Sequence, residues 1–130
     1  NHNFNIDNDL IVRCNLTVED AKMVTLKLLE LENAPDAIFG INDEVAIGAL
    51  MAIKEKGLKI PQDVAVVGFS NSQRSRYIEP SLTTMDQNPV KIGTLAAKLL
   101  FDQIGGKSEF GETKEIIVPA DLIVRASSSR

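Results

Sequence analysis

The sequence of 130 residues contains one cysteine, one histidine and no tryptophan. The single Cys14 excludes an internal disulfide and a cysteine-rich metal site, and it suits a reducing cytoplasm, where we expect the protein to reside. The one histidine, His2, stands at the start of the chain, so no Ser-His-Asp or Cys-His arrangement can be built around it. Neither a Walker motif nor a G-x-G-x-x-G pattern occurs. We therefore predict that the chain is not an enzyme and has no catalytic residue, metal or cofactor.

Long apolar runs and clustered positive charge are also missing. No run approaches the ~20 residues of a membrane-spanning helix, so we expect no membrane association. The net charge is −4, and Arg74 and Arg76 form too short a basic stretch to contact DNA, so we interpret them as part of a solvated loop. Residues 1–5 lack a basic n-region, an apolar h-region and an initiator methionine. We expect no signal peptide and a chain that begins within a longer protein.

Local signals predict three helices. Thr17 and Asp20 resemble a capping box at the start of the first helix. Asn42 caps the second helix, which Gly57 ends, and Pro89 follows Asn88 at the start of the third. The stripes predicted to face inward are Ala21, Val24, Leu28 and Leu31 in the first helix, Ala46, Ala49, Leu50 and Ile53 in the second, and Ile92, Leu95, Ala96, Leu99 and Leu100 in the third.

Short apolar runs between the helices predict strands. Residues 37–41 and 64–69 are continuously apolar, as in strands covered on both faces, and an opening strand is expected near residues 10–12. Strands alternating with helices give two overlapping βαβ units, hence an α/β fold with a Rossmann-like parallel sheet flanked by helices. Further strands are predicted at residues 82–85, 116–118 and 122–124.

Polar residues follow the predicted strands at residues 13–17, 41–43 and 69–72. In open α/β sheets, ligands bind outside the carboxyl ends of the strands, so these junctions predict a site for a small hydrophilic ligand. Asp43 and Glu44 are interpreted as partners of the helix dipole rather than paired catalytic acids. Cys14 is interpreted as a small apolar filler, with a ligand contact or redox switch as the alternative.

Four segments resemble the lactose-repressor (LacI/GalR) family of transcription regulators. Residues 35–50, PDAIFGINDEVAIGAL, are similar to the family pattern P-x-A-I-F-x-x-N-D-x-x-A-x-G-A-L, and residues 57–69, GLKIPQDVAVVGF, are similar to G-L-x-x-P-x-D-V-x-V-V-G-F. Residues 77–87, YIEPSLTTMDQ, and 119–127, PADLIVRAS, resemble Y-x-x-P-x-L-T-T-x-x-Q and the closing P-x-x-L-x-x-R-x-S. The resemblance runs from about Asp7 to the C-terminus.

The resemblance implies part of a two-subdomain, type I periplasmic-binding-protein fold. Residues 1–86 are expected to form most of the distal subdomain, residues 87–106 a helix of the proximal subdomain, and residues 107–130 strands that return to the distal one. It further implies a homodimer that binds a small, sugar-like effector. Operator DNA would be bound only through an N-terminal domain outside this chain.

The resemblance also suggests which residues contact the effector and the second subunit. Asn42 matches a position that contacts the effector in many relatives. Ser70 stands where most relatives carry an aspartate, Leu16 where a stacking aromatic is common, and Asn71 adds a further polar group. The dimer candidates are Ile47, Leu50 and Tyr77; core packing is favoured for Leu50, and interface and core are weighed equally for the other two.

Two expectations follow for the whole protein. The third helix would lose the sheet that it normally covers, so we expect it to pack on a neighbouring chain, to swap, or to re-dock locally. The alternative to a regulator is a periplasmic sugar-binding protein of a transport system, which shares the two-lobed fold. An enzyme on the same sheet lacks candidate catalytic groups.

Overall fold

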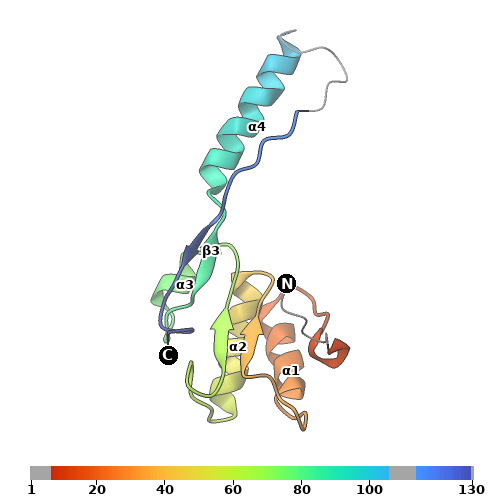
Figure 1. Cartoon of the computed structure of the whole chain (residues 1–130), viewed down its shortest axis with the longest axis vertical. Coiled ribbons are helices and arrows are strands. Elements are labelled where there is room, and N and C mark those ends of the chain that lie inside the picture. Colours follow the sequence, from red (N-terminus) through yellow and green to blue (C-terminus); the bar gives the residue numbers. More distant parts are fainter. Residues whose placement is uncertain (1–6, 106–113, 130) are drawn as a thin grey trace.

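The computed structural model describes residues 7–105 and 114–129, which form an α/β body from which one long helix projects (Figure 1). None of the described helices is long and apolar enough to cross a membrane. The elements in chain order are the 3-10 helix η1 Asn8–Leu10, α1 Val18–Leu28, β1 Ala37–Phe39, α2 Asp43–Glu55, β2 Ala65–Val67, α3 Arg74–Tyr77, β3 Thr84–Asp86, α4 Pro89–Ile104 and β4 Asp121–Ile123.

The second predicted βαβ unit is present. β1 and β2 pair in parallel, with Ala37 opposite Ala65 and Phe39 opposite Val67, and α2 forms the crossover between them. A parallel bridge between Val67 and Thr83 continues the sheet beyond β2. The α/β class with a parallel sheet is therefore confirmed.

The strand predicted near residues 10–12 is wrong. The Asp7 carboxylate accepts a hydrogen bond from the backbone N–H of Asp9 at 3.0 Å and starts the helical turn η1. Residues 11–15 then form no regular element. Leu10, Val12 and Cys14 still line a cavity of about 240 Å³ beside β1, so the alternation of a strand is kept without its hydrogen bonds. An aspartate that bonds to its own backbone competes with sheet pairing, and the apolar pattern cannot reveal that competition.

The three predicted helix starts are confirmed, and those of α1 and α2 depend on local hydrogen bonds. Thr17 Oγ1 accepts from the Asp20 N–H at 3.2 Å, and Asn42 Oδ1 accepts from the Val45 N–H at 2.9 Å. The Asp20 carboxylate does not return to Thr17, as in a full capping box; it accepts from the Asn15 N–H at 2.6 Å. The two bonds to Thr17 and Asn42 each satisfy one of the backbone donors that the first helical turn leaves free.

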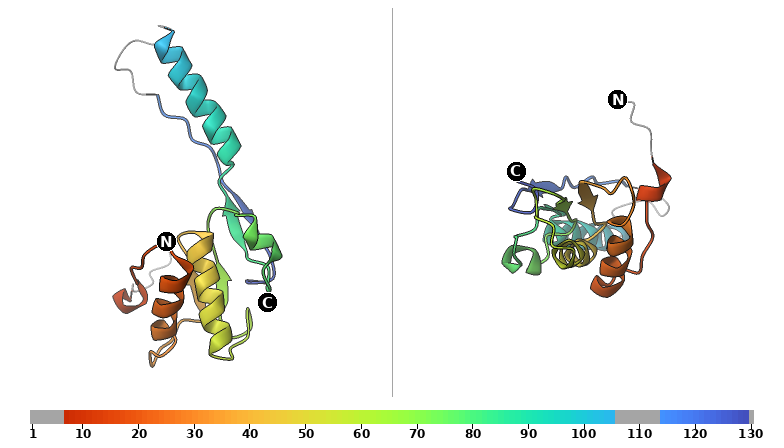
Figure 2. Two further views of the ribbon diagram at one scale, coloured as in Figure 1. Left: turned by 180° about the vertical axis from the view of Figure 1, so that it is seen from behind. Right: turned by 90° about the horizontal axis from the view of Figure 1, so that it is seen from below.

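The core lies between α2 and one face of the sheet. Its buried members are Ala46, Ala49, Leu50, Ile53, Val64, Val66 and Leu82. Both α1 and α2 pack on the same side of β1 and β2, as the view from below in Figure 2 shows. Phe39 on β1 consequently stays 64% exposed. The expectation of cover on both faces is wrong for β1, because an apolar run shows only that a face can be covered, whereas no residue of β2 is exposed.

Helix α4 projects from the body, and residues 114–120 are the described segment that runs beside it (Figure 1). No residue of α4 is buried. Its predicted inward side lines an open groove of about 360 Å³ together with residues 114–118. Local re-docking of α4 on the sheet is therefore wrong; packing on a neighbouring chain or a swap stays a prediction.

The closing segment differs from its prediction in one strand. Residues 116–118 form no strand, whereas β4 pairs antiparallel with β3, with Thr84 opposite Ile123 and Asp86 opposite Asp121. Strand pairing requires a neighbour with free hydrogen-bonding groups, and the helix α4 beside residues 116–118 offers none. The division of the chain into distal and proximal parts stays a prediction.

Candidate functional site

Three of the four predicted effector residues lie at the carboxyl ends of β1 and β2. Asn42 follows β1, and Ser70 and Asn71 follow β2, so parallel pairing of the strands places them at one edge of the sheet. Leu16 lies in the loop before α1 and its side chain is 60% exposed. All four remain predicted site residues, and their surroundings differ in what they leave free to bind a ligand.

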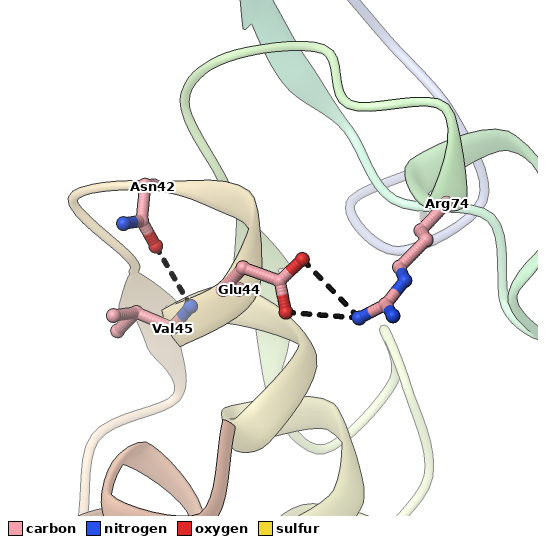
Figure 3. Close-up of polar contacts among 4 residues, drawn as sticks. All are labelled: Asn42, Glu44, Val45 and Arg74. Carbon is pink, nitrogen blue, oxygen red and sulfur yellow. Dashed lines mark hydrogen bonds and ion pairs between the residues drawn. The ribbon is translucent and has the colours of Figure 1, made fainter. Parts of the chain in front are cut away.

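Asn42 has a structural task that occupies one side of its amide. Figure 3 shows Asn42 Oδ1 turned toward the Val45 N–H, which it caps. Its Nδ2 donates to no residue of the described chain, so this group is free to reach a ligand. In the same view, Arg74 Nη1 meets the Glu44 carboxylate at 3.1 Å. This pair is exposed, so Arg74 is solvated as expected. The loop predicted for Arg74 and Arg76 is wrong, because both lie in the short helix α3.

Ser70 is exposed and has a strained backbone. Its φ is +146°, and the next residue, Asn71, has φ +49°. Non-glycine residues in such regions cost on the order of 1–3 kcal/mol unless the surroundings hold them. The Ser70 N–H donates to the Met85 carbonyl at 3.1 Å, whereas its hydroxyl has no partner among the described residues. The strained turn therefore presents a free hydroxyl at the edge of the sheet.

Asn71 is almost fully used within the protein. Its N–H donates to Thr84 Oγ1 at 3.1 Å, its Nδ2 to Asp86 Oδ2 at 2.9 Å, and its Oδ1 accepts from Arg125 Nη2 at 2.7 Å. The amide retains one hydrogen on Nδ2 and one lone pair on Oδ1 for a ligand. The main role of Asn71 in the structure is therefore to stabilise the turn that contains Ser70.

Asp43 has a role beyond the predicted one. It lies in the first turn of α2, as a partner of the helix dipole should, and Asn42 provides the cap, but Asp43 is 1% exposed and its carboxylate bonds outside the helix. Its Oδ2 accepts from the Ser72 N–H and its Oδ1 from Thr84 Oγ1, both at 2.6 Å. Asp43 therefore ties the start of α2 to the turn after β2 and to β3. The one signal of this role in the sequence was that Asn42 already supplies the N-cap of α2, which leaves the Asp43 side chain available for other contacts.

Arg125 was not singled out as a site residue by the sequence, although it is the arginine of the closing P-x-x-L-x-x-R-x-S block. Besides Asn71, its Nη1 donates to the Leu82 carbonyl at 2.6 Å and to Ser75 Oγ at 2.9 Å. The partners of its guanidinium lie 43 to 54 positions earlier in the chain. Such contacts arise only when the chain is folded, so no local pattern could have revealed them.

The same turn contains a buried group without a partner. Ser72 Oγ is buried and forms no hydrogen bond with the described residues. Buried hydroxyls in folded proteins nearly always have a partner, so this one calls for a bound molecule or a rearrangement of the turn. Ser70 Oγ and Asn42 Nδ2 are then two neutral polar groups available at the ends of two neighbouring strands, with the unpaired Ser72 Oγ buried in the same turn.

Asp86, at the end of β3, has a lowered pKa in the folded protein. Its pKa is lowered by hydrogen bonds from the Asn88 N–H and from Asn71 Nδ2, with a further contribution from the positive charge of Arg76. A lowered pKa in the folded state means that the unfolded chain takes up the proton first as the pH falls. The stability that ionised Asp86 contributes is present above its ordinary pKa and is lost below it.

We therefore expect an acid-dependent effect of the Asp86→Asn substitution. The substitution lowers the free energy of unfolding at about pH 6, and its effect shrinks as the pH falls from about 4 to about 2. Urea unfolding followed by circular dichroism at several pH values measures this difference. A difference that stays constant over the whole range contradicts the assignment.

The predicted interface residues lie in unlike surroundings. Leu50 is 3% exposed and belongs to the core, as favoured, whereas Tyr77 at the end of α3 is 79% exposed. Ile47 is half-buried and lines, with Leu50, a surface hollow of about 290 Å³. Their part in a dimer stays a prediction. Cys14 is half-buried in the cavity beside β1, in the company of Leu10 and Val12.

Comparison with known proteins connects this geometry with a family. A profile of the periplasmic binding protein-like domain matches residues 4–128. The HTH-type transcriptional repressor PurR of Histophilus somni (strain 129Pt) is 40% identical over 126 residues, 96% of this chain and 37% of the repressor. The HTH-type transcriptional repressor CytR of Escherichia coli (strain K12) is 34% identical over 123 residues, 95% of this chain and 36% of the repressor.

The likeness extends to solved structures. A LacI family transcriptional regulator from Arthrobacter sp. FB24, in complex with lactose, has a TM-score of 0.83 and 26% identity, over 89% of this chain and 43% of that one. This chain spans a little over a third of the length of the two repressors. The match of nearly every residue to one profile, with regulators as relatives in both sequence and structure, leads to one conclusion: the chain belongs to the family of periplasmic binding protein-like domains, in the LacI/GalR branch that its four sequence blocks resemble.

Proposed function

We propose that this chain is the effector-sensing part of a LacI/GalR-type transcription regulator. It binds a small, uncharged, sugar-like molecule at the carboxyl ends of β1 and β2. The observation that carries the proposal is the contrast between the free groups of Asn42 and Ser70 and the bonded groups of Asp43 and Asn71 beside them. Rigid support behind free donors and acceptors is the arrangement that a polar ligand site requires.

The relatives support the chemical class of this ligand. The Arthrobacter regulator was solved with lactose bound, and sugar hydroxyls suit neutral amide and hydroxyl groups. Ser70 stands where most family members carry an aspartate, so the strongest charge-assisted acceptor of the family site is absent here. We expect each hydrogen bond to the ligand to be correspondingly modest.

Control of DNA binding then follows from a shift between two conformations. The effector favours one relative orientation of the two subdomains, and it shifts that balance only by its difference in affinity for the two states. A DNA-reading region outside this chain, acting as a homodimer in the cytoplasm, would convert the orientation into tighter or weaker operator binding. The effector enters as the regulator's signal, and no reaction is expected.

The test joins a gel shift to calorimetry on the complete gene product and its own upstream DNA. Sugars, sugar phosphates and nucleobases are added in turn, and we expect one compound to abolish or strengthen the shifted band. A sugar that binds while no DNA fragment is shifted would favour the transport receptor instead. Absence of both binding and gel shift contradicts the proposal as a whole.

Two serine variants locate the binding site. Ser70→Ala removes a hydroxyl from the proposed binding site. It should lower the affinity for the active compound by about three- to tenfold, which is the contribution of one hydrogen bond. Ser81→Ala is the matched control, because Ser81 lies before β3, at the opposite edge of the sheet. Equal affinities of Ser70→Ala and the unchanged protein would place the ligand elsewhere.

A further inference from the structure

We propose that Arg125 is a positioning residue for the effector site. It acts through Asn71 and holds the turn of residues 70–72 in the conformation that presents Ser70. The inference rests on the proposed function for its consequence, ligand affinity, but its structural part stands on the hydrogen bonds of the closing segment alone.

The guanidinium of Arg125 is held by neutral acceptors. Its three bonds go to the Leu82 carbonyl at 2.6 Å, Asn71 Oδ1 at 2.7 Å and Ser75 Oγ at 2.9 Å. It forms no ion pair with a described carboxylate. A planar fork of donors fixes its acceptors in direction as well as distance, which a lysine ammonium does not do. Arg125 is therefore built to orient its partners rather than to neutralise a charge.

The turn needs such a partner because it is strained. Ser70 and Asn71 are consecutive non-glycine residues with positive φ, and asparagine accepts that backbone conformation more readily than most residues. The Asn71 amide is clamped from two sides, by Arg125 at its oxygen and by Asp86 at its nitrogen. Loss of either clamp frees the amide to rotate and lets the turn relax.

Both clamps lie on the segments that connect the body to α4. Asp86 ends β3, three residues before α4, and Arg125 follows β4, which returns from α4 and pairs with β3. Asn88 joins the two segments, because its Nδ2 donates to Asp121 Oδ2 at 3.0 Å and its N–H to Asp86 Oδ1 at 2.8 Å. The conformation of the effector turn is thereby linked to the pair of segments about which α4 would reorient.

The deciding experiment uses NMR on the protein without added ligand, so it does not depend on the effector. Arg125→Met should shift the resonances of the Asn71 side-chain amide and of the Ser70 and Asn71 backbone. It should also speed hydrogen exchange of the Asn71 backbone N–H by at least about tenfold. Arg125→Lys should give an intermediate shift, since it keeps the charge and loses the fork. Unchanged Asn71 resonances in Arg125→Met overturn the proposal.

A control variant separates positioning from general destabilisation. Buried Ser127 belongs to the same segment and bonds to the Val66 carbonyl at 2.6 Å and the Thr83 N–H at 2.8 Å, but not to Asn71. Ser127→Ala should lower the Tm and leave the Asn71 resonances in place. If both variants shift the Asn71 resonances equally, Arg125 has only a structural role.

A binding arm uses lactose as the probe on the complete gene product. We expect Arg125→Met to lower the affinity for lactose by about tenfold or more, and Ser127→Ala to lower it by less than about twofold. The double variant Asn71→Ala/Arg125→Met should lose no more affinity than Asn71→Ala alone. Additive losses in the double variant would contradict action through Asn71. If lactose does not bind the unchanged protein, the sugar-like ligand class is weakened, while the NMR measurement still decides the role of Arg125.

Discussion

Replacing Asp43 with alanine should lower the free energy of unfolding by about 3–5 kcal/mol, the largest effect that we expect from one polar side chain in this protein. The carboxylate is buried and accepts two hydrogen bonds of 2.6 Å, from the Ser72 N–H and from Thr84 Oγ1. A bond to a charged group is worth about 1.5–3 kcal/mol, and the substitution leaves both donors buried and unpaired. Urea unfolding monitored by circular dichroism measures the loss.

Two further variants show whether this loss comes from the hydrogen bonds. Asp43→Asn keeps the shape and one acceptor oxygen, so about half of the loss should remain. Glu44→Ala is the matched control, since the neighbouring Glu44 pairs with Arg74 at the surface and such pairs contribute about 0–1 kcal/mol. An Asp43→Ala variant no less stable than Glu44→Ala would show that the buried contacts contribute nothing.

Replacing Gly48 with alanine should lower the free energy of unfolding by about 1–3 kcal/mol, despite the better helix propensity of alanine. Gly48 lies in α2 where α1 crosses it closely. A Cβ atom there would meet the Val18 carbonyl oxygen at 2.4 Å, the Ala21 Cβ at 2.7 Å and the Lys22 nitrogen at 2.9 Å. Two of these three atoms belong to the backbone, so the helices themselves must move apart.

The same substitution at Gly93 should have the opposite effect on stability. Gly93 lies in α4, and a Cβ atom there meets nothing within 4 Å. The change should therefore raise helix stability by about 0.5–1 kcal/mol, visible as greater helicity on heating. If Gly48→Ala also stabilised the protein, the close packing of α1 on α2 would be disproved.

Much of the secondary structure could be predicted because its signals are local. The starts of α1 and α2 depend on Thr17 and Asn42, whose caps bond to residues three positions ahead. Gly57, with φ +73°, ends the second helix as expected. The parallel βαβ unit followed from two apolar runs separated by a helix, and the family followed from four sequence blocks in order.

The misplaced strands have one cause. Residues 10–12 and 116–118 carry the right apolar pattern, but a strand exists only if a neighbour offers hydrogen-bonding groups in register. The first segment is diverted by the turn at Asp7, and the second lies beside the helix α4. The same limit applies to β1, whose apolar run did not determine that one face stays open.

The candidate site divides in the same way. The sequence by itself determined that Asn42, Ser70 and Asn71 stand at strand ends, because strand order and a polar junction can be read along the chain. Only the tertiary structure decided that the Ser70 hydroxyl has no partner among the described residues, whereas the Asn71 amide is hydrogen-bonded to Asp86 and Arg125. The reason is distance along the sequence: Asp43 finds Thr84 41 residues away, and Arg125 finds Asn71 54 residues away. A cap closes within one helical turn, whereas these bonds form only after the sheet has brought the segments together.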